Sequence, residues 1–361
     1  MTEQAHLHAF VPYLTYPDWY RPSGARFRNM ALDYRPPDMD ASYFQYTSLP
    51  IVSRPFNGAI AYRRVRDAVT AFRPDLILNY WLYPDGHAAV KLGRDLGVPV
   101  IVTALGSDIR RIDDPATRFL TRRVLSRADL LITVSGELGA RACEMGASPE
   151  RTRTILNGFD SSIFYPGDRA AERARLGLAA DAEIVLYVGS LIPTKGLGEL
   201  ADAFVALAAR RPGLTLVCGG EGPFRATLEA KAAAAGLSAQ LLLPGKLSSP
   251  QVRNWMVASN LFCLPSYSEG CPNVVIEALA SGRAVVATNV GGIPELVNEN
   301  NGILMPPRDT PALIAALETA LARPWDDQAI AGTYRRSWRE VAADTWAVCQ
   351  EMLANREGKV R

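Results

Sequence analysis

The sequence predicts an α/β protein built from two doubly wound, Rossmann-like domains that face each other across a cleft. Short β-branched or leucine-rich runs alternate with Ala-rich stretches of helical periodicity, and Gly, Pro or Ser residues separate them. This alternation is typical of a parallel sheet covered by helices. The chain has 361 residues, 48% of them hydrophobic, which is enough for about two domains with a core each.

The first domain is expected to span residues 1–165 and to bind the acceptor of the reaction discussed below. Its strands are predicted at His8–Leu14, Asp75–Tyr80, Val98–Thr103, Leu130–Val134 and Arg153–Leu156, with helical patterns at Gly86–Leu96 and Ala116–Arg127. The stretch Tyr165–Asp181 contains Pro166, Gly167 and Gly177, a composition typical of a connection. The domain boundary is therefore placed there.

The second domain is expected at residues 166–335. Its strands are predicted at Ile184–Gly189, Leu214–Cys218, Gln240–Leu243, Leu261–Pro265, Ala284–Thr288 and Ile303–Met305, with helices near 196–210, 222–236, 249–258, 274–281 and 310–322. Residues 336–361 form a last helix that no strand follows. We expect this helix to pack back on the first domain.

Composition excludes several classes of protein. The 39 basic and 37 acidic residues leave a net charge of +2, too little for a nucleic-acid-binding field. No apolar run is long enough to span a bilayer, and the start MTEQAHLHAF lacks the features of a secretory signal. The five cysteines fit no metal-binding spacing. A cytoplasmic protein with reduced thiols is expected.

The most informative motif runs from Ser266 to Gly282, where a predicted strand ends, a loop carries Glu269, and a helix carries Glu277 in its first turns. Helix N-termini offer unpaired amides to phosphate oxygens, and Gly270 permits close approach of the backbone. Carboxylates beside a phosphate site are suited to binding neutral hydroxyl groups. Glu277 would then bind the hydroxyl groups of a ribose, and Glu269 those of a transferred sugar. Alternatively, Glu269 is an ordinary loop residue and Glu277 a favourable first-turn charge.

This block, with the following Ser281–Val297, closely resembles the signature of retaining glycosyltransferases of family 4, which have two Rossmann domains (GT-B architecture) and include polysaccharide-biosynthesis members. Arg283 departs from a common proline. The resemblance covers nearly the whole chain and implies a nucleotide-sugar donor. The donor-binding residues that it implies are Gly24, Gly189, Ser190, Lys195, Gly245, Glu269, Gly270, Cys271, Pro272, Asn273, Val274, Val275 and Glu277.

The run Val188–Gly196 looks like the phosphate loop of that family, and Lys195 matches its lysine. Where the family has arginine this chain has Ser190, so one cation is missing. In the first domain only Gly24 matches the family's opening loop. Leu105 stands where many relatives carry a histidine that holds the transferring sugar, which leaves Asp108 as the polar group at that strand end.

The resemblance implies a retaining hexosyltransferase in which Glu269, Lys195 and Asp108 are the catalytic residues. Asp85, His87 and Asp108 are candidates for contact with a glycan or lipid-linked acceptor. Neither a cofactor nor a metal is expected, since Lys195 and the helix terminus already meet the diphosphate. The alternatives are a nucleotide-sugar epimerase and a catalytically weakened nucleotide-sugar-binding protein. A dehydrogenase is excluded because no G-x-G-x-x-G follows an early strand.

Basic residues of the first domain suggest peripheral attachment to anionic lipid at the inner face of the cytoplasmic membrane. They are Arg110, Arg111, Arg118, Arg122, Arg123 and Arg127, with a second group at Arg63, Arg64 and Arg66. Each residue near the surface adds about 1 kcal/mol of attraction. Alternatively, they form a solvated helix face partly paired with Asp113, Asp114 and Asp129.

Overall fold

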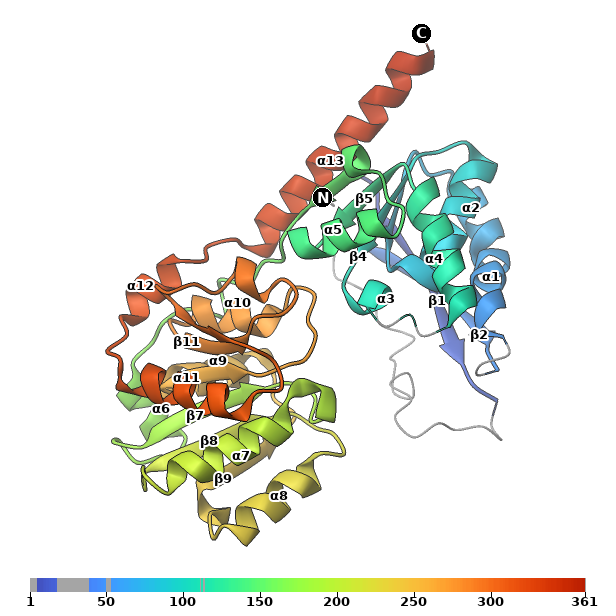
Figure 1. Cartoon of the computed structure of the whole chain (residues 1–361). Coiled ribbons are helices and arrows are strands. Elements are labelled where there is room, and N and C mark those ends of the chain that lie inside the picture. The colour runs from blue at the N-terminus through green and yellow to red at the C-terminus, as the bar shows by residue number, and fades with distance from the viewer. Residues whose placement is uncertain (1–4, 18–38, 50–52, 111, 113, 361) are drawn as a thin grey trace. The chain divides into compact units, whose positions relative to one another are not determined.

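A computed structural model describes residues 5–17, 39–49, 53–110, 112 and 114–360 (Figure 1). The chain divides into two compact units. Unit 1 contains residues 1–156 and 342–361, and unit 2 contains residues 157–341. Both have parallel sheets with helices between most consecutive strands, which confirms the predicted fold class of two Rossmann-like domains.

Unit 1 contains a four-stranded parallel sheet in the order β3-β4-β5-β6. Its strands are β3 (Ile77–Tyr80), β4 (Val100–Ala104), β5 (Leu130–Thr133) and β6 (Thr152–Thr154), and its helices are α1 (Asn57–Phe72), α2 (His87–Leu96), α3 (Ser107–Arg110), α4 (Pro115–Arg127) and α5 (Gly136–Glu144). Every residue of β4 and β5 is buried. Burial on both faces explains why these strands read as continuous apolar runs.

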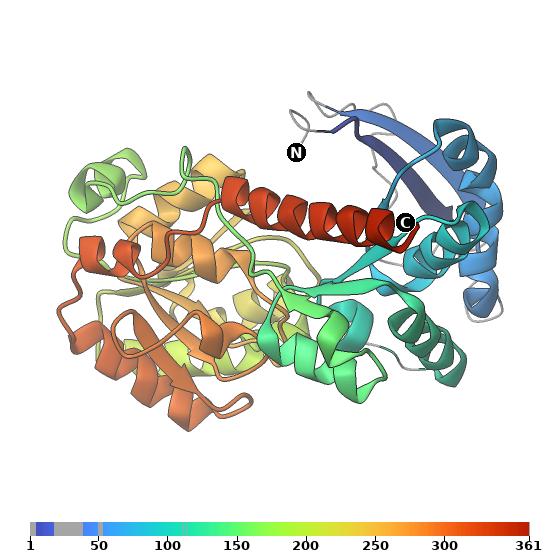
Figure 2. The ribbon, with the colours of Figure 1, turned by 90° about the horizontal axis from the view of Figure 1, so that it is seen from above.

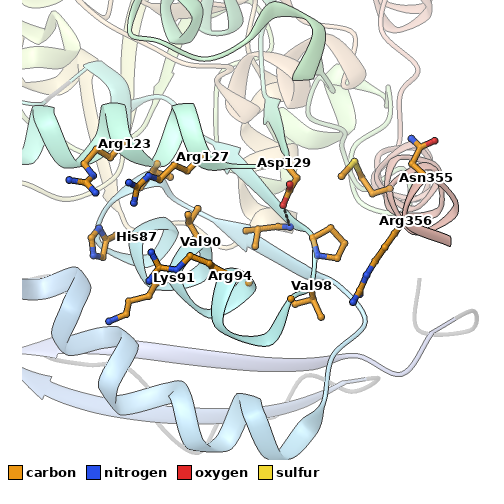
Figure 3. A pocket seen from close by; sticks show the side chains of 16 residues that line it. His87, Val90, Lys91, Arg94, Val98, Arg123, Arg127, Asp129, Asn355 and Arg356 are labelled. Carbon is orange, nitrogen blue, oxygen red and sulfur yellow. Dashed lines mark hydrogen bonds between the residues drawn. The ribbon is translucent and has the colours of Figure 1, made fainter. Parts of the chain in front are cut away.

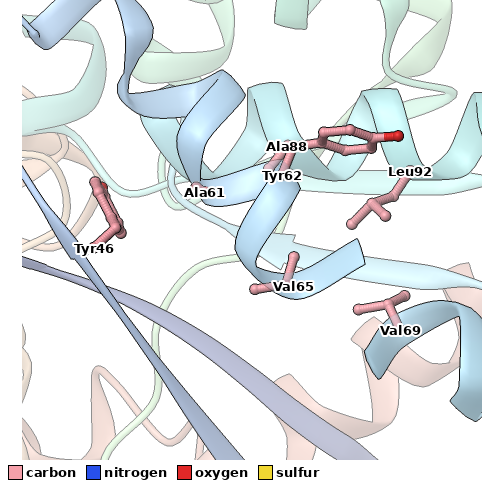
Figure 4. Close-up of a cluster of buried hydrophobic side chains, with 7 residues drawn as sticks. All are labelled: Tyr46, Ala61, Tyr62, Val65, Val69, Ala88 and Leu92. Carbon is pink, nitrogen blue, oxygen red and sulfur yellow. The ribbon is translucent and has the colours of Figure 1, made fainter. Parts of the chain in front are cut away.

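A separate two-stranded parallel sheet joins β1 (His8–Thr15) to β2 (Asp40–Thr47). Strand β1 is predicted from the sequence, whereas β2 and α1 are not. Tyr46 of β2 and buried residues of α1 and α2 form one apolar cluster (Figure 4), whose members are Tyr46, Ala61, Tyr62, Val65, Val69, Ala88 and Leu92. The three or four residue spacing of the α1 members is the helical signal that could have revealed α1.

Unit 2 contains a six-stranded parallel sheet in the order β12-β11-β10-β7-β8-β9 (Figure 1). Its strands are β7 (Glu183–Val188), β8 (Leu214–Gly219), β9 (Leu241–Gly245), β10 (Leu261–Leu264), β11 (Ala284–Thr288) and β12 (Gly302–Met305). Its helices are α6 (Arg169–Arg175), α7 (Leu197–Ala208), α8 (Arg225–Ala234), α9 (Ser249–Ala258), α10 (Asn273–Ala280), α11 (Thr310–Ala322) and α12 (Asp327–Gly332). All six predicted strands of this half are confirmed.

The first crossing between the units follows Leu156 rather than the predicted residue 165, because the connecting segment packs on unit 2. The Asn157 Nδ2 donates to the carbonyl oxygen of Cys271 at 3.1 Å, and Phe159 forms a parallel bridge with Ser337. The last helix, α13 (Trp338–Val360), is continuous (Figure 2), and from Ala342 onward it belongs to unit 1. Within the described residues, no helix has the length and apolar composition needed to cross a bilayer.

Arg283, the departure from the family proline, is 1% exposed. Its guanidinium donates to Asp327 Oδ2 at 3.1 Å, and Arg169 contacts the same carboxylate at 3.0 Å. Burial lowers the pKa of Arg283 to about 10. This cation therefore fixes α12 to the strand that Arg283 precedes, within unit 2, and supplies no charge to the strand-end loops.

Candidate active site

The candidate site lies at the carboxyl ends of the strands of unit 2, where β7 and β10 are neighbours although two strands and three helices separate them in the chain. From β7 the strand order runs one way to β8 and β9, and from β10 it runs the other way to β11 and β12. Ligands of open α/β sheets bind at such a reversal of strand order. The two most informative sequence motifs follow these two strands.

Lys195 and Glu269 meet at this reversal. Lys195 ends the 3₁₀ turn Pro193–Lys195 after β7, and Glu269 stands in the loop after β10. The Lys195 Nζ lies 2.5 Å from Glu269 Oε1, and the side chains are 22% and 12% exposed. The fold thus brings a cation and a carboxylate that lie 74 residues apart in sequence into one ion pair.

Close backbone packing at Gly196 brings the two loops together. Gly196 has φ of 68°, and a Cβ on it would lie 1.9 Å from the carbonyl oxygen of Pro265 at the end of β10. The amide of Tyr267 donates to the carbonyl oxygen of Thr194 at 3.1 Å. A residue without Cβ is therefore needed for α7 to begin directly against the loop that carries Glu269.

Backbone hydrogen bonds also join the neighbouring strand-end loops. The Gly292 amide donates to Gly270 at 2.7 Å, which connects the loops after β11 and β10. On the other side the Gly189 amide donates to Gly219 at 2.9 Å, and the Gly220 amide donates to Gly245 at 2.7 Å. Gly189, Gly245 and Gly270 of the expected donor set are thus held in one hydrogen-bonded row.

Helix α10 places its N-terminus in the same row, directly after Cys271 and Pro272. The Val275 amide donates to the Pro272 carbonyl oxygen at 3.0 Å. The amides of Asn273 and Val274 precede it in the first turn, where an α-helix provides no acceptor. The Asn273 side chain accepts a hydrogen bond from Asn157 Nδ2 at 2.7 Å, so its side chain fixes the helix start.

Glu277 lies one turn into α10 and is partly buried. Burial raises the pKa of its carboxyl to about 7. The group therefore changes charge near neutral pH, unlike an ordinary glutamate. Among the described residues, no cluster of three or more His, Cys, Asp or Glu side chains is placed to hold a metal ion.

Two tyrosines that the sequence analysis did not identify support the loops. The Tyr187 hydroxyl, from the buried end of β7, donates to the carbonyl oxygen of Ser190 at 2.9 Å. The Tyr267 hydroxyl donates to Glu199 on α7 at 2.6 Å, and Arg308 lies over its ring at 4.5 Å. Each tyrosine lies within three residues of a predicted strand end, but no sequence pattern indicates its hydrogen-bond partner.

In unit 1, Asp108 joins two strand-end loops. Its carboxylate accepts hydrogen bonds from the amides of Gly106 at 2.8 Å, Leu105 at 3.1 Å and Leu82 at 3.3 Å. Burial raises the pKa of Asp108, and these amides oppose that rise. The carboxylate thus holds the loop after β4 against the loop after β3, an arrangement suited to positioning.

Asp85 and His87 follow β3 in the same unit. Trp81, which opens this segment, has φ of 92°, a conformation rare for a residue with a side chain. Burial raises the pKa of Asp85 to about 7. The His87 ring makes an edge contact with Tyr83 at 6.1 Å and lines a pocket between helices. Gly24 lies outside the described residues.

Two Rossmann-like units with a candidate site at a reversal of strand order fit the GT-B architecture of glycosyltransferases. Residues 168–340 match the family "Glycosyl transferases group 1", and residues 8–158 match the family "Glycosyl transferase 4-like domain". The chain belongs to this family of glycosyltransferases, which confirms the resemblance found in the sequence.

Two relatives support this membership. The chain is 31% identical over 320 residues to a Bacillus subtilis (strain 168) protein assigned to teichuronic acid biosynthesis as the glycosyltransferase TuaC, an alignment covering 81% of this chain and 76% of that protein. It is also 31% identical over 305 residues to the D-inositol 3-phosphate glycosyltransferase of Mycobacterium avium (strain 104), covering 74% and 70% of the two chains.

Solved structures share the fold. The sucrose-phosphate synthase of Thermosynechococcus elongatus superposes with a TM-score of 0.80 at 24% identity, over 97% of this chain and 90% of that chain. Anabaena HepE in complex with UDP superposes with a TM-score of 0.72 at 22% identity, over 86% of each chain.

We expect Gly196→Ala to destabilise the protein more than Gly177→Ala. Both glycines have φ of 68°, but a Cβ at Gly177 meets nothing within 4 Å, whereas one at Gly196 collides with Pro265. The control should lose about 1–2 kcal/mol, the cost of a left-handed residue with a Cβ. Urea unfolding of both variants measures the difference. Equal losses would mean that the contact at Pro265 relaxes freely.

Proposed function

We propose that the protein is a retaining hexosyltransferase that moves a sugar from a nucleotide-sugar donor to a glycan or lipid-linked acceptor in cell-surface polysaccharide biosynthesis. Family membership and the biosynthetic role in the name of TuaC support the reaction class and the setting. UDP in the HepE complex supports a nucleotide donor. The observation that carries the proposal is the Lys195–Glu269 pair beside the N-terminus of α10.

The proposed transfer is a same-face displacement in which the leaving phosphate oxygen takes the acceptor proton. Lys195 and the first-turn amides of Asn273 and Val274 stabilise the negative charge that develops on the diphosphate. Glu269 accepts hydrogen bonds from hydroxyl groups of the transferred sugar, and Glu277 accepts those of the ribose. Ser190 contributes a hydrogen bond but no charge. Such a scheme requires neither a cofactor nor a metal.

The proposed acceptor residues belong to unit 1. Asp108, which the family resemblance implies as a catalytic residue, is proposed to position the Leu105 loop through the amides that it binds. Asp85 is the acceptor contact best supported by chemistry, because its carboxyl titrates near neutral pH and can accept or donate a hydrogen bond there.

A catalytically weakened nucleotide-sugar-binding protein is the second candidate, and the observations that favour it are Ser190 and Leu105. Family membership favours transfer over epimerisation. Incubation with radiolabelled UDP-, GDP- and ADP-sugars and a lipid-linked acceptor extract distinguishes the candidates. Labelled glycan supports the transferase, whereas tight donor binding without any product supports the binding protein.

Lys195→Ala and Glu269→Ala should change nucleotide binding in opposite directions. Loss of Lys195 removes a charged hydrogen-bond donor and should weaken binding of the bare nucleoside diphosphate by roughly 1.5–3 kcal/mol. Loss of Glu269 removes the carboxylate 2.5 Å from that cation and should strengthen binding, while most of the transfer rate is lost. Calorimetry and a product assay measure the two effects.

Lys231→Ala is the matched control, since this exposed lysine pairs with Asp202 on another part of unit 2. It should leave both measurements unchanged. A Glu269→Ala variant with near-normal turnover would contradict the sugar contact. Unchanged nucleotide affinity in Lys195→Ala would contradict the phosphate assignment.

Donor affinity should rise between pH 6 and pH 8 because of Glu277. Its carboxyl, with a pKa of about 7, is largely protonated at pH 6, and only the carboxylate accepts hydrogen bonds from both ribose hydroxyls. Affinity should therefore fall by up to about tenfold at pH 6. The probe is the nucleotide sugar, because a terminal phosphate itself titrates near pH 6.

Glu277→Gln should flatten this pH dependence, and Asp85→Asn should leave it intact although Asp85 has a similarly raised pKa. A pH dependence that survives Glu277→Gln would assign the titration to another group and remove the main support for ribose binding by Glu277.

We also propose peripheral attachment of the protein to anionic lipid at the inner face of the cytoplasmic membrane through unit 1. Of the predicted basic residues, Arg110 pairs with Glu137 and its side chain is 11% exposed, so it is not part of this surface. Arg118 and Arg122 are exposed on α4 and bind backbone carbonyls rather than carboxylates. They keep their charge available to lipid headgroups.

Arg118→Gln with Arg122→Gln should lower binding to vesicles containing phosphatidylglycerol by roughly 30-fold, at about 1 kcal/mol per residue. Arg175→Gln with Arg225→Gln, which removes the same charge from exposed positions of unit 2, is the control. Sedimentation at low salt measures binding. Equal binding to neutral and anionic vesicles would exclude electrostatic attachment.

A further inference from the structure

A pocket of about 840 Å³ lies within unit 1, between α2, α4 and the end of α13 (Figure 3). Its lining runs along α2 from His87, at the end of the loop that follows β3, to Val98 and Pro99, which precede β4. His87 therefore belongs both to this pocket and to the candidate acceptor loop after β3. The volume lies within the range of small-molecule sites.

The walls of the pocket are strongly basic. Three helices contribute cations to the lining of the pocket. The cations are Lys91 and Arg94 from α2, Arg123 and Arg127 from α4, and Arg356 from α13. Asp129 is the only carboxylate among the lining residues that the structure describes, and it accepts the Val100 amide at 2.8 Å (Figure 3). The described lining therefore holds five cations and one carboxylate, and Arg94 also lies 3.5 Å from Asp95 outside the lining.

Stabilisation of the helix dipoles explains why some of these cations are present. Arg94 and Arg127 lie in the last turns of α2 and α4, where cations stabilise the helix dipole. Lys91 and Arg123 lie outside those turns. Lys91 lies over the Tyr62 ring at 4.0 Å and Arg123 over the Phe119 ring at 5.5 Å. The charge of Lys91 also acts on Asp95 outside the pocket lining.

The backbone is shaped to bring these cations onto one wall. A Cβ on Gly93 would lie 2.1 Å from Val100 Cγ2, so this glycine allows α2 to pack directly on β4. Residues 87, 91 and 94 share one face of α2, and residues 123 and 127 share one face of α4. The pKa of His87 reflects this positive charge. Burial lowers it, and so do the charges of Arg123, Lys91 and Arg127.

We propose that this pocket is a binding site for a phosphate group, separate from the donor site of unit 2. An arginine guanidinium group can donate two parallel hydrogen bonds to the oxygens of one phosphate group, and Lys91 adds a point charge. Phosphate of this kind can come from a phospholipid headgroup or from a soluble phosphate compound. Occupancy would neutralise the repulsion among the cations that line the pocket.

The test uses His87 as a local reporter in the full-length protein. The chain has three histidines, so the His87 imidazole signal is identified in NMR spectra by its loss in His87→Gln. Inorganic pyrophosphate is one probe, and phosphatidylcholine vesicles with or without phosphatidylglycerol are the other. Phosphate in the pocket should raise the pKa of His87 by at least half a unit, because it neutralises the surrounding cations.

Arg123→Gln with Arg127→Gln should abolish this response, whereas Arg175→Gln with Arg225→Gln, exposed residues of unit 2 outside the pocket, should preserve it. A response to pyrophosphate indicates a soluble ligand, and a response restricted to anionic vesicles indicates a lipid headgroup. No response to either probe, or equal loss in both double variants, overturns the proposal. Nucleotide binding measured in the same samples reports on unit 2 separately.

Discussion

The contact between Gly196 and Pro265 is the constraint on which the candidate site depends. It is where α7 begins against the end of β10, and it leaves no room for a side chain. Because β7 and β10 are adjacent strands of a parallel sheet, their following loops would in any case lie at one edge. Because Gly196 has no Cβ, the two loops are not only near each other but in direct contact. The hydrogen bond from the Tyr267 amide to the Thr194 carbonyl oxygen holds them in this position.

The ion pair between Lys195 and Glu269 follows from this packing. The two groups were assigned to different parts of the donor, the lysine to phosphate and the glutamate to sugar. At 2.5 Å they neutralise each other, so each sets the electrostatic environment of the other's ligand. A diphosphate that approaches Lys195 also approaches Glu269. In the proposed mechanism, the affinity for a bare nucleotide and the affinity for a sugar are therefore coupled through this one ion pair.

Burial raises the pKa of carboxyl groups in both units, Asp85 and Asp108 in unit 1 and Glu277 in unit 2. The carboxylate of Asp108 is surrounded by backbone amides, whereas burial of Asp85 and Glu277 moves both pKa values to about 7. Buried carboxyls of this kind favour the neutral form until a ligand stabilises the charge. The contacts proposed for Asp85 and Glu277 thus involve carboxyl groups that can change charge near neutral pH.

Much of the fold could be predicted from sequence. The strands of unit 2 are buried on both faces, so each appears as an apolar run between breaks, and all six were identified. Strand β2 was not, because a short aromatic segment acquires strand structure only by pairing with β1, about 30 residues earlier in the chain. Helix α1 had the apolar spacing of a helix and could have been found.

The sequence by itself determined the fold class, the family and the identity of the residues at the strand ends, because local periodicity and motif order depend on neighbours in the chain. The tertiary structure decided which of those residues meet. The pairing of Lys195 with Glu269, the burial of Arg283 and the basic pocket between α2, α4 and α13 join segments far apart in sequence. Such contacts depend on strand order and backbone packing, which no local pattern encodes.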